Sequence, residues 1–184
     1  MKFSDPFKIL IPSERWAPTQ SQMDMFQNAY EKLLPPLVYK IRLAVEKWRD
    51  EDYAGASETS KLLMNFWFNQ EHLIGQSKFC FFFSQREAIE SIIYLYEVAK
   101  AKDKYELMRF DSSGRVSAGM FDENWTRYVV KMATGSGKTK VMGLTLVWSY
   151  FNKLYEVDSS LSKNFLVIAP NIIVLNRLRK DFDG

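Results

Sequence analysis

Apolar residues recur at helical spacing in the first half of the chain. This period is clear over 20–34 and again over 37–53, and Pro35 and Pro36 separate the two stretches, so two helices are expected. The predicted apolar face of the second helix consists of Leu37, Ile41, Ala44, Val45 and Trp48. Ser57 is placed to cap a third helix. The main apolar residues of that third helix are Leu62, Leu63, Phe66 and Trp67.

A fourth helix is predicted from Ser84 to about Lys100. Ser84 and Glu87 have the spacing of a capping box, in which two side chains satisfy amides at the start of a helix. The apolar side of this helix consists of Ala88, Ile89, Ile92, Ile93 and Tyr96. Further along, residues 111–114 (DSSG) are typical of a turn, which we expect to connect two short strands.

The pattern becomes strand-like after Asn124. Residues 125–132 (WTRYVVKM) and 164–170 (NFLVIAP) are short apolar segments of the kind found in buried strands. Residues 138–155 predict a helix that is apolar on most sides, as expected for a helix packed on a sheet, and 171–182 predict another helix. The order strand, loop, helix, strand, helix predicts an α/β fold class, with a parallel sheet flanked by helices and preceded by a helical region.

Composition narrows the class of protein. A chain of 184 residues with 47% hydrophobic and 26% charged residues is typical of a globular protein with one main core. The 25 basic and 22 acidic residues give a net charge of +3, which neither requires nor excludes a polyanionic partner. Cys80 and His72 are single, so neither a disulfide framework nor a metal cluster is expected. No apolar segment is long enough to span a membrane, and we expect a cytoplasmic protein with no membrane partner.

Residues 131–143 (KMATGSGKTKVMG) have the composition of a phosphate-binding loop between a strand and a helix. In such loops, successive backbone N–H groups surround an anion, and the following helix presents its positive end to the same charge. Gly135 and Gly137 permit this backbone path. The Lys138 ammonium group can reach the β- and γ-phosphates, and the Thr139 hydroxyl can ligate Mg²⁺. A chance Gly-Lys-Thr sequence in a surface turn is the alternative.

Two other segments offer candidate contacts. Gln85 is either an ordinary first-turn residue of its helix, or a side chain whose amide donates to and accepts from the adenine edge. Pro170 and Asn171 follow the second predicted strand at its carboxyl end, where ligands of open α/β sheets bind. Their backbone could hold a nucleic-acid phosphate. The aromatic residues expected in the core are Phe79, Phe81, Phe82 and Phe83.

Gln85, residues 133–139 (ATGSGKT) and residues 167–178 (VIAPNIIVLNRL) resemble the Q motif, motif I and motif Ia of superfamily 2 helicases, in the same order. This order favours the adenine-binding interpretation of Gln85. The finer similarity, over about 36–182, is to the restriction (Res) subunit of type III restriction-modification systems and its DEAD/DEAH-box relatives. Met132 stands where the usual motif I has its first glycine, a position that need not be glycine in superfamily 2. Further segments similar to the Res subunit are VEKWRDEDYAGAS, LLMNFWF, FFFSQREAIESIIYLYEV and VVKMATGSGKTKVM.

The resemblance implies a RecA-like ATP-binding domain over 84–184, preceded by an arm and a helical region over 1–83. It implies ATP and Mg²⁺ as cofactors, DNA as partner of the full-length protein, and a modification methyltransferase as a further partner. The implied cofactor-binding residues are Gln85, Thr134, Gly135, Ser136, Gly137, Lys138 and Thr139, with Lys138 and Thr139 catalytic and Thr139 the Mg²⁺ ligand. The implied nucleic-acid contacts are Pro170 and Asn171.

Hydrolysis of ATP requires a carboxylate at the end of a later strand and an arginine that neutralises transition-state charge. Neither group is identifiable in the sequence. The candidate carboxylates, Asp181 and Asp183, lack a preceding apolar strand. We therefore expect the amino-terminal portion of a DNA helicase or translocase, ending before the DEAD/DEAH motif, which binds ATP weakly and turns it over negligibly. Two alternatives stay open: a non-enzymatic interaction module with a vestigial phosphate loop, and a small P-loop kinase or switch.

Overall fold

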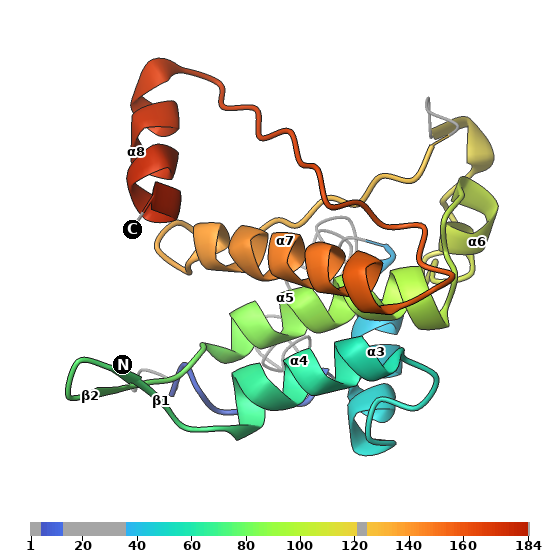
Figure 1. The fold of residues 1–184 in the computed structure, drawn as a ribbon. Helices are drawn as coiled ribbons and strands as arrows, with labels where there is room; N and C mark the ends of the chain where they lie inside the picture. Colours follow the sequence, from blue (N-terminus) through green and yellow to red (C-terminus); the bar gives the residue numbers. More distant parts are fainter. Residues whose placement is uncertain (1–4, 13–35, 121–124, 184) are drawn as a thin grey trace, which may run out of the picture. The chain divides into compact units, whose positions relative to one another are not determined.

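A computed structural model describes residues 5–12, 36–120 and 125–183 of the chain (Figure 1). Its α-helices are α3 (Val38–Asp50), α4 (Glu58–Asn69), α5 (Phe83–Ile93), α6 (Lys104–Met108), α7 (Lys138–Tyr155) and α8 (Ile172–Asp183). The other elements are strands β1 (His72–Ile74) and β2 (Ser77–Phe79), a π-helical turn η1 (Tyr94–Val98) and a 3₁₀ turn η2 (Ala118–Met120). The helix predicted over 20–34 lies outside the described residues.

The chain divides into two compact units. The first unit contains residues 1–56 and 90–129, and the second contains residues 57–89 and 130–184, so the boundary lies within α5. The phosphate-loop sequence belongs to the second unit. The division into a region over 1–83 and a RecA-like domain over 84–184 stays a prediction.

In the first unit, α3 packs its predicted apolar face against a small core. The buried side chains of this core are Leu95, Ala101 and Phe110. The half-buried α3-side residues that pack against it are Leu37, Ile41 and Ala44. Glu90 is fully buried and accepts hydrogen bonds from Arg49 Nε at 3.0 Å and from the Tyr53 hydroxyl at 2.6 Å. A buried carboxylate requires such partners, and this ion pair links the end of α3 to α5. Helix α3 confirms the second helix predicted from the sequence.

The turn predicted at 111–114 is present, but the described residues on either side of it form no strand. Asp111 accepts hydrogen bonds from the backbone N–H groups of Ser113 at 2.8 Å and Val116 at 3.0 Å. The bond from Val116 is the main reason that the pKa of Asp111 lies below its usual value. Helix α6 and turn η2 replace the predicted strands. Asp103 caps α6 through two backbone amides, and this local cap favours a helical turn over a strand.

In the second unit, buried polar contacts join α4 to α7. The predicted cap of α4 is confirmed, because Ser57 Oγ accepts a hydrogen bond from the Ser60 N–H at 3.2 Å. The indole N–H of Trp148 donates to Ser60 Oγ at 2.8 Å. Asn152 Nδ2 donates to Ser57 Oγ at 3.0 Å. Two serines at the start of α4 are therefore held by two side chains of α7.

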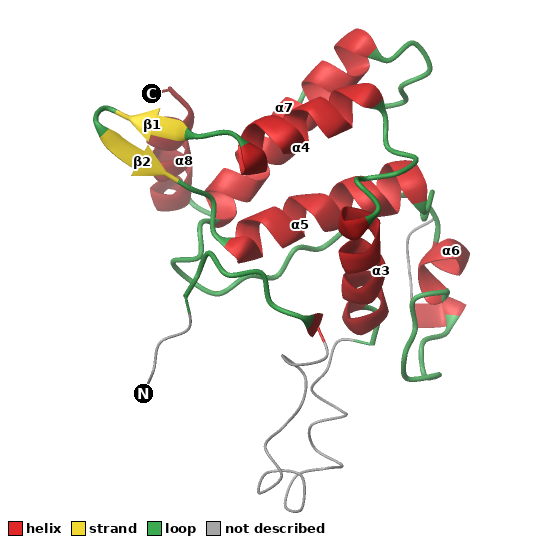
Figure 2. Cartoon of the chain, turned by 90° about the horizontal axis from the view of Figure 1, so that it is seen from below, coloured by secondary structure: helices red, strands yellow, loops and turns green. Residues whose placement is uncertain are grey.

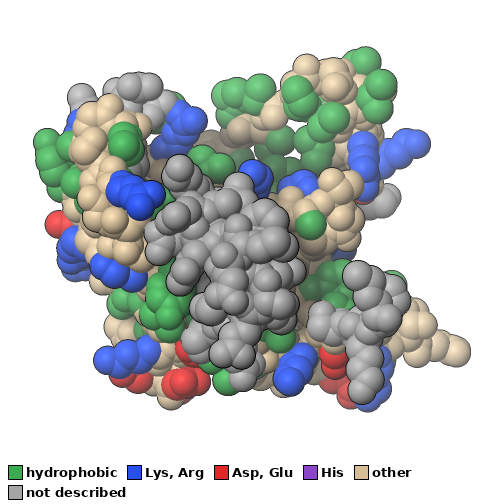
Figure 3. All heavy atoms as spheres, turned by 180° about the vertical axis from the view of Figure 1, so that it is seen from behind, with side chains coloured by type: hydrophobic (Ala, Val, Ile, Leu, Met, Phe, Trp, Pro, Cys, Tyr) green, Lys and Arg blue, Asp and Glu red, His purple; other side chains and the backbone are tan. Residues whose placement is uncertain are grey.

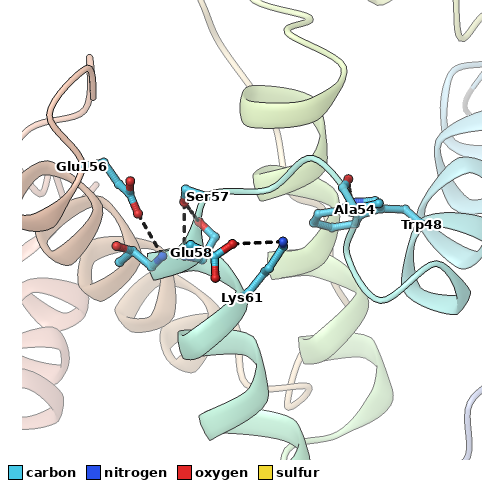
Figure 4. Close-up of polar contacts among 8 residues, drawn as sticks. Trp48, Ala54, Ser57, Glu58, Lys61 and Glu156 are labelled. Atoms are coloured by element: carbon cyan, nitrogen blue, oxygen red, sulfur yellow. Dashed lines mark hydrogen bonds and ion pairs between the residues drawn. The ribbon is translucent and has the colours of Figure 1, made fainter.

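Glu156, at the carboxyl end of α7, contacts the amino end of α4, where the two serines also lie. Its Oε1 accepts a hydrogen bond from the Thr59 N–H at 2.9 Å, and Figure 4 shows the carboxylate directed at the first turn of α4. Hydrogen bonds from the side chain and then the backbone of Thr59 hold the pKa of Glu156 below its usual value. A carboxylate is favourable at the positive amino end of a helix, so this contact stabilises the α4–α7 pair.

The apolar surfaces of α4 and α7 are buried only in part. Helix α4 buries Met64 and Trp67, whereas Leu62 is 68% exposed. Helix α7 follows its predicted range, and its apolar residues are buried only in part, since Val147 and Leu154 are 38% and 45% exposed. Among the described residues, no sheet covers the exposed apolar residues of α7. No helix of the described chain is both long and apolar enough to cross a membrane.

Strands β1 and β2 form an antiparallel hairpin that the sequence pattern did not predict (Figure 2). His72 pairs with Phe79 and Ile74 with Ser77, so two residues connect the strands. Gly75 begins this connection with φ of +62°, a conformation that glycine adopts without steric cost. Of the four phenylalanines expected in the core, Phe83 is buried and the other three are half-buried.

The predicted parallel sheet is not formed by the described residues. The β1–β2 hairpin is the only sheet there, and residues 125–132 and 164–170 are extended without ladder partners. Parallel strands normally need a paired neighbour and cover on both faces, and neither segment has these in the described chain. The observed fold is therefore mixed and mainly helical.

Side-chain contacts replace strand pairing in the first of these two segments. The Thr126 hydroxyl donates to the Lys102 carbonyl at 2.7 Å, and the Tyr128 hydroxyl donates to the Ala101 carbonyl at 3.0 Å. Burial, assisted by the nearby Tyr96, raises the pKa of Tyr128 to about 12.

Candidate functional site

Residues 133–137 form a tight loop that leads directly into α7. The backbone N–H and the hydroxyl of Ser136 both donate to the Ala133 carbonyl, at 3.3 Å and 2.7 Å. Gly135 and Gly137 have φ values of +81° and +82°, in the left-handed region that favours glycine. Gly137 is also the amino-terminal cap residue of α7. The segment is neither helix nor strand, as a phosphate loop requires.

Lys138, the first residue of α7, folds back over this loop. Its Nζ donates to the carbonyls of Met132 at 3.2 Å and Ala133 at 2.9 Å. The first turn of α7 contains no acidic residue, and the Lys140 N–H already donates to the Gly137 carbonyl at 3.0 Å. The amides that begin a helix otherwise have no acceptor within it. A lysine is unfavourable at the positive end of a helix. Its presence beside such amides therefore indicates a site for an anion.

Gln85 lies against the loop, although 51 residues separate it from Ser136 in the sequence. Its side chain is buried, and its Nε2 donates to the Ser136 carbonyl at 3.0 Å. Its Oε1 accepts a hydrogen bond from the Phe82 N–H at 3.0 Å. The structure thus brings the two main sequence-predicted parts of the site together. Whether Gln85 contacts adenine stays a prediction.

The helix predicted from Ser84 is confirmed, but the predicted capping box is replaced by a single contact two residues earlier, from the Phe82 N–H to the Gln85 side chain. Helix α5 begins at Phe83, and Gln85 occupies the third helical position. Its amide oxygen satisfies the Phe82 N–H, which is the role predicted for the Glu87 carboxylate three residues after Ser84. An amide oxygen accepts this bond as a carboxylate would, while its NH₂ group is left to bond the loop. The first-turn role of Gln85 therefore coexists with its contact to the loop.

Thr139 is the candidate Mg²⁺ ligand, and it follows Lys138 in the first turn of α7. In the part of the chain that the structure describes, no three His, Cys, Asp or Glu side chains gather where they could hold a metal ion. A single hydroxyl is nevertheless an adequate protein contribution, because Mg²⁺ commonly keeps several waters and is held mainly by substrate phosphates. Thr139 thus fits a Mg²⁺ ion that enters with a triphosphate.

Pro170 and Asn171, the predicted nucleic-acid contacts, are exposed residues at the start of α8. Asn171 Oδ1 accepts a hydrogen bond from the Val174 N–H at 3.0 Å, so this side chain caps α8. Asp181 lies inside α8 and not at the end of a strand. The capping role accounts for Asn171 locally, and DNA contact by either residue stays a prediction.

Some contributors to the site were not predicted. The carbonyls of Met132 and Ala133 hold Lys138, and the Phe82 N–H orients Gln85. All three are backbone groups, which any residue type provides, so the sequence carries no signal for them. The spacing of Phe82 and Gln85 at the start of an apolar helical run was the one available indication of the capping contact.

A glycine loop that precedes a long helix, with a lysine at the junction, is characteristic of phosphate-loop proteins. Residues 78–184, more than half of the chain, match the model of the family described as type III restriction enzyme, res subunit. The chain belongs to this family, which confirms the predicted resemblance. The match includes Gln85, the loop, Pro170 and Asn171. Searches of curated proteins and of solved structures found no match to the chain.

Proposed function

We propose that this chain provides the ATP- and Mg²⁺-binding half-site of a DNA helicase or translocase, the Res subunit of a type III restriction enzyme. The observation that carries the proposal is the loop at 133–137, with two left-handed glycines and the Lys138 ammonium group folded over it. Membership of the family supports it. In the full-length protein, ATP and Mg²⁺ would drive movement along DNA, and a modification methyltransferase is a further proposed partner.

Each residue of the site has a defined role in this proposal. Backbone N–H groups of Gly135 and of 137–139 would surround the phosphates, and Lys138 would exchange its two carbonyl partners for β- and γ-phosphate oxygens. Thr139 contributes its hydroxyl to Mg²⁺, which when bound neutralises phosphate charge. Phosphate oxygens are much stronger acceptors for an ammonium group than backbone carbonyls, so this exchange favours binding.

Binding and hydrolysis are separable in this chain. Asp181 is helical, and the described residues contain no acidic residue at the end of a buried parallel strand. We expect the 184-residue chain to bind ATP weakly and to hydrolyse it negligibly, because hydrolysis also requires a stabilising arginine that contributes about a thousandfold or more to the rate. Robust ATPase activity of this chain that Lys138→Ala abolishes would contradict this expectation.

The direct test is calorimetric titration of the 184-residue chain with Mg-ATP. Lys138→Ala should weaken binding by about tenfold or more, the contribution typical of one charge-assisted hydrogen-bonding group. Lys131→Ala is the matched control, because it removes the same charge from an exposed position just before the loop. Equal affinity of Lys138→Ala and the wild type would rule out the proposed site.

DNA binding distinguishes the proposal from an interaction module with a vestigial loop. The net charge of the chain is only +3, and Figure 3 shows Lys and Arg side chains in small groups among other residue types. Weak, salt-dependent DNA binding that changes with ATP in the wild type but not in Lys138→Ala supports a translocase component. Partner binding that is indifferent both to ATP and to Lys138→Ala supports the interaction module.

A further inference from the structure

The carboxamide of Gln85 forms a bridge between the start of α5 and the loop. Nε2 donates to the Ser136 carbonyl at 3.0 Å, and Oε1 accepts from the Phe82 N–H at 3.0 Å. The side chain is only 5% exposed. Both ends of the amide are thus used inside the protein, and little of its surface is left for a base.

Gly137 shows how closely this bridge fits the loop. A Cβ atom added at Gly137 would lie 2.1 Å from Gln85 Nε2 and 3.2 Å from its Cδ. The same addition at Gly135 meets no atom within 4 Å. Gly135 therefore serves the backbone conformation alone, whereas Gly137 also provides the space in which the amide of Gln85 lies.

The hydrogen bond to Ser136 orients one peptide group of the loop. In a planar trans peptide, the carbonyl of one residue and the N–H of the next point in opposite directions. Holding the Ser136 carbonyl toward Gln85 therefore turns the Gly137 N–H away from α5. Backbone amides of this kind are the groups that surround an anion in a phosphate loop.

We propose that Gln85 is a positioning residue for the phosphate loop, which holds the Ser136–Gly137 peptide in its anion-binding orientation. This inference rests on the proposed nucleotide-binding function. It assigns to Gln85 a contribution to triphosphate binding that does not depend on the base. A base-reading glutamine would instead leave the binding of a base-free triphosphate unchanged.

The test compares Gln85→Met with the wild-type chain by titration with Mg-ATP, Mg-GTP and Mg-tripolyphosphate. Methionine has a similar length and no charge, so it removes the bridge without adding electrostatic repulsion. All three affinities should fall by a similar factor, about tenfold, as expected for the loss of a buried hydrogen bond. Ser84→Ala, at the exposed neighbouring position, is the control and should change none of them.

Two results would overturn the proposal. A loss of affinity confined to Mg-ATP would assign Gln85 to the base, and unchanged affinity for all three ligands would show that the bridge has no effect. A wild-type chain that binds none of the ligands would instead refute the proposed function. Thermal melting without ligand tells these failures apart, because it measures the bridge independently of nucleotide binding.

Thermal melting of four proteins measures the bridge without any ligand: wild type, Gln85→Ala, Gly137→Ala and the double variant. The added methyl group at residue 137 clashes with the amide only when Gln85 is present, while the backbone strain at Gly137 occurs in both backgrounds. Gly137→Ala should therefore lower the melting temperature less in the Gln85→Ala background. Equal losses in the two backgrounds would show that Gln85 does not pack on the loop and would overturn the proposal.

Discussion

At the scale of single residues, the loop depends on two glycines for different reasons. Gly135 and Gly137 share a left-handed φ, but only Gly137 lies under the amide of Gln85. The lysine that follows, Lys138, satisfies its ammonium group with carbonyls of the loop itself. Backbone conformation, local packing and charge therefore each constrain the four residues 135–138.

This difference predicts unequal costs for two similar substitutions. Gly135→Ala introduces only backbone strain, and we expect it to lower the free energy of unfolding by about 1 kcal/mol. Gly137→Ala adds the clash at 2.1 Å to the same strain and should cost clearly more. Urea unfolding of both variants measures the two values, and equal costs would contradict the observed packing.

At the scale of elements, the α4–α7 contact holds the helix that carries the loop. Its groups are polar and buried, with Ser60 fully buried and Trp148 only 2% exposed. Buried polar groups stabilise a contact only while each has a partner, since an unsatisfied group retains its full desolvation cost. The pairing of α4 with α7 is therefore specific in register as well as stable.

Ser60→Ala tests this element contact. The substitution removes the acceptor of the buried Trp148 indole N–H, and the expected loss in the free energy of unfolding is about 1–3 kcal/mol. Ser77→Ala, at an exposed position in β2, serves as the matched control and should have a negligible effect. Chemical denaturation gives both values. Similar stability of the two variants would show that the Trp148–Ser60 bond is unimportant.

The same element contact should weaken in acid. The pKa of Glu156 is lowered in the folded protein by its hydrogen bonds from Thr59, so the carboxylate stabilises the fold above the unfolded pKa, and this stability is lost as pH falls through the folded pKa. As the pH falls below the ordinary value of 4.5 and through the lower folded pKa, the wild type should progressively lose its melting-temperature advantage over Glu156→Gln. Asp158→Asn controls for a general loss of negative charge. A constant difference between wild type and Glu156→Gln from pH 7 to pH 3 would argue against this linkage.

At the scale of the whole molecule, an apolar segment with the pattern of a β-strand is exposed to solvent. Residues 156–171 connect α7 and α8 without regular structure (Figure 1). Within this connection, Leu166 and Ile168 are 86% and 81% exposed, while Phe165 and Val167 are 42% and 39% exposed. This alternation is that of an extended strand, and contiguous exposed apolar surface favours association.

We expect the double substitution Leu166→Lys and Ile168→Lys to reduce both the binding of a hydrophobic dye and concentration-dependent self-association. Val157→Lys is the matched control, because Val157 is 96% exposed but lies outside the alternating segment. Dye fluorescence and analytical ultracentrifugation measure the two effects. The prediction is wrong if the control variant lowers them as much as the double substitution.

The sequence by itself determined several helices and the residue types of the loop. The range of α7, the cap at Ser57 and the glycine–lysine loop follow from side-chain spacing and from residue types with specific conformations, which act over a few residues. Family membership was recognisable on the same grounds. These features depend on local interactions, so the order of residues is sufficient to specify them.

The tertiary structure alone decided which segments pair and which contacts Gln85 makes. Residues 125–132 and 164–170 have strand-like patterns, yet a strand forms only when another segment supplies hydrogen bonds and cover. The bridge from Gln85 to Ser136 joins residues 51 positions apart and ends on a backbone carbonyl, which no side-chain pattern marks. Long-range partners are set by how the chain packs, and for that physical reason the sequence pattern did not reveal them.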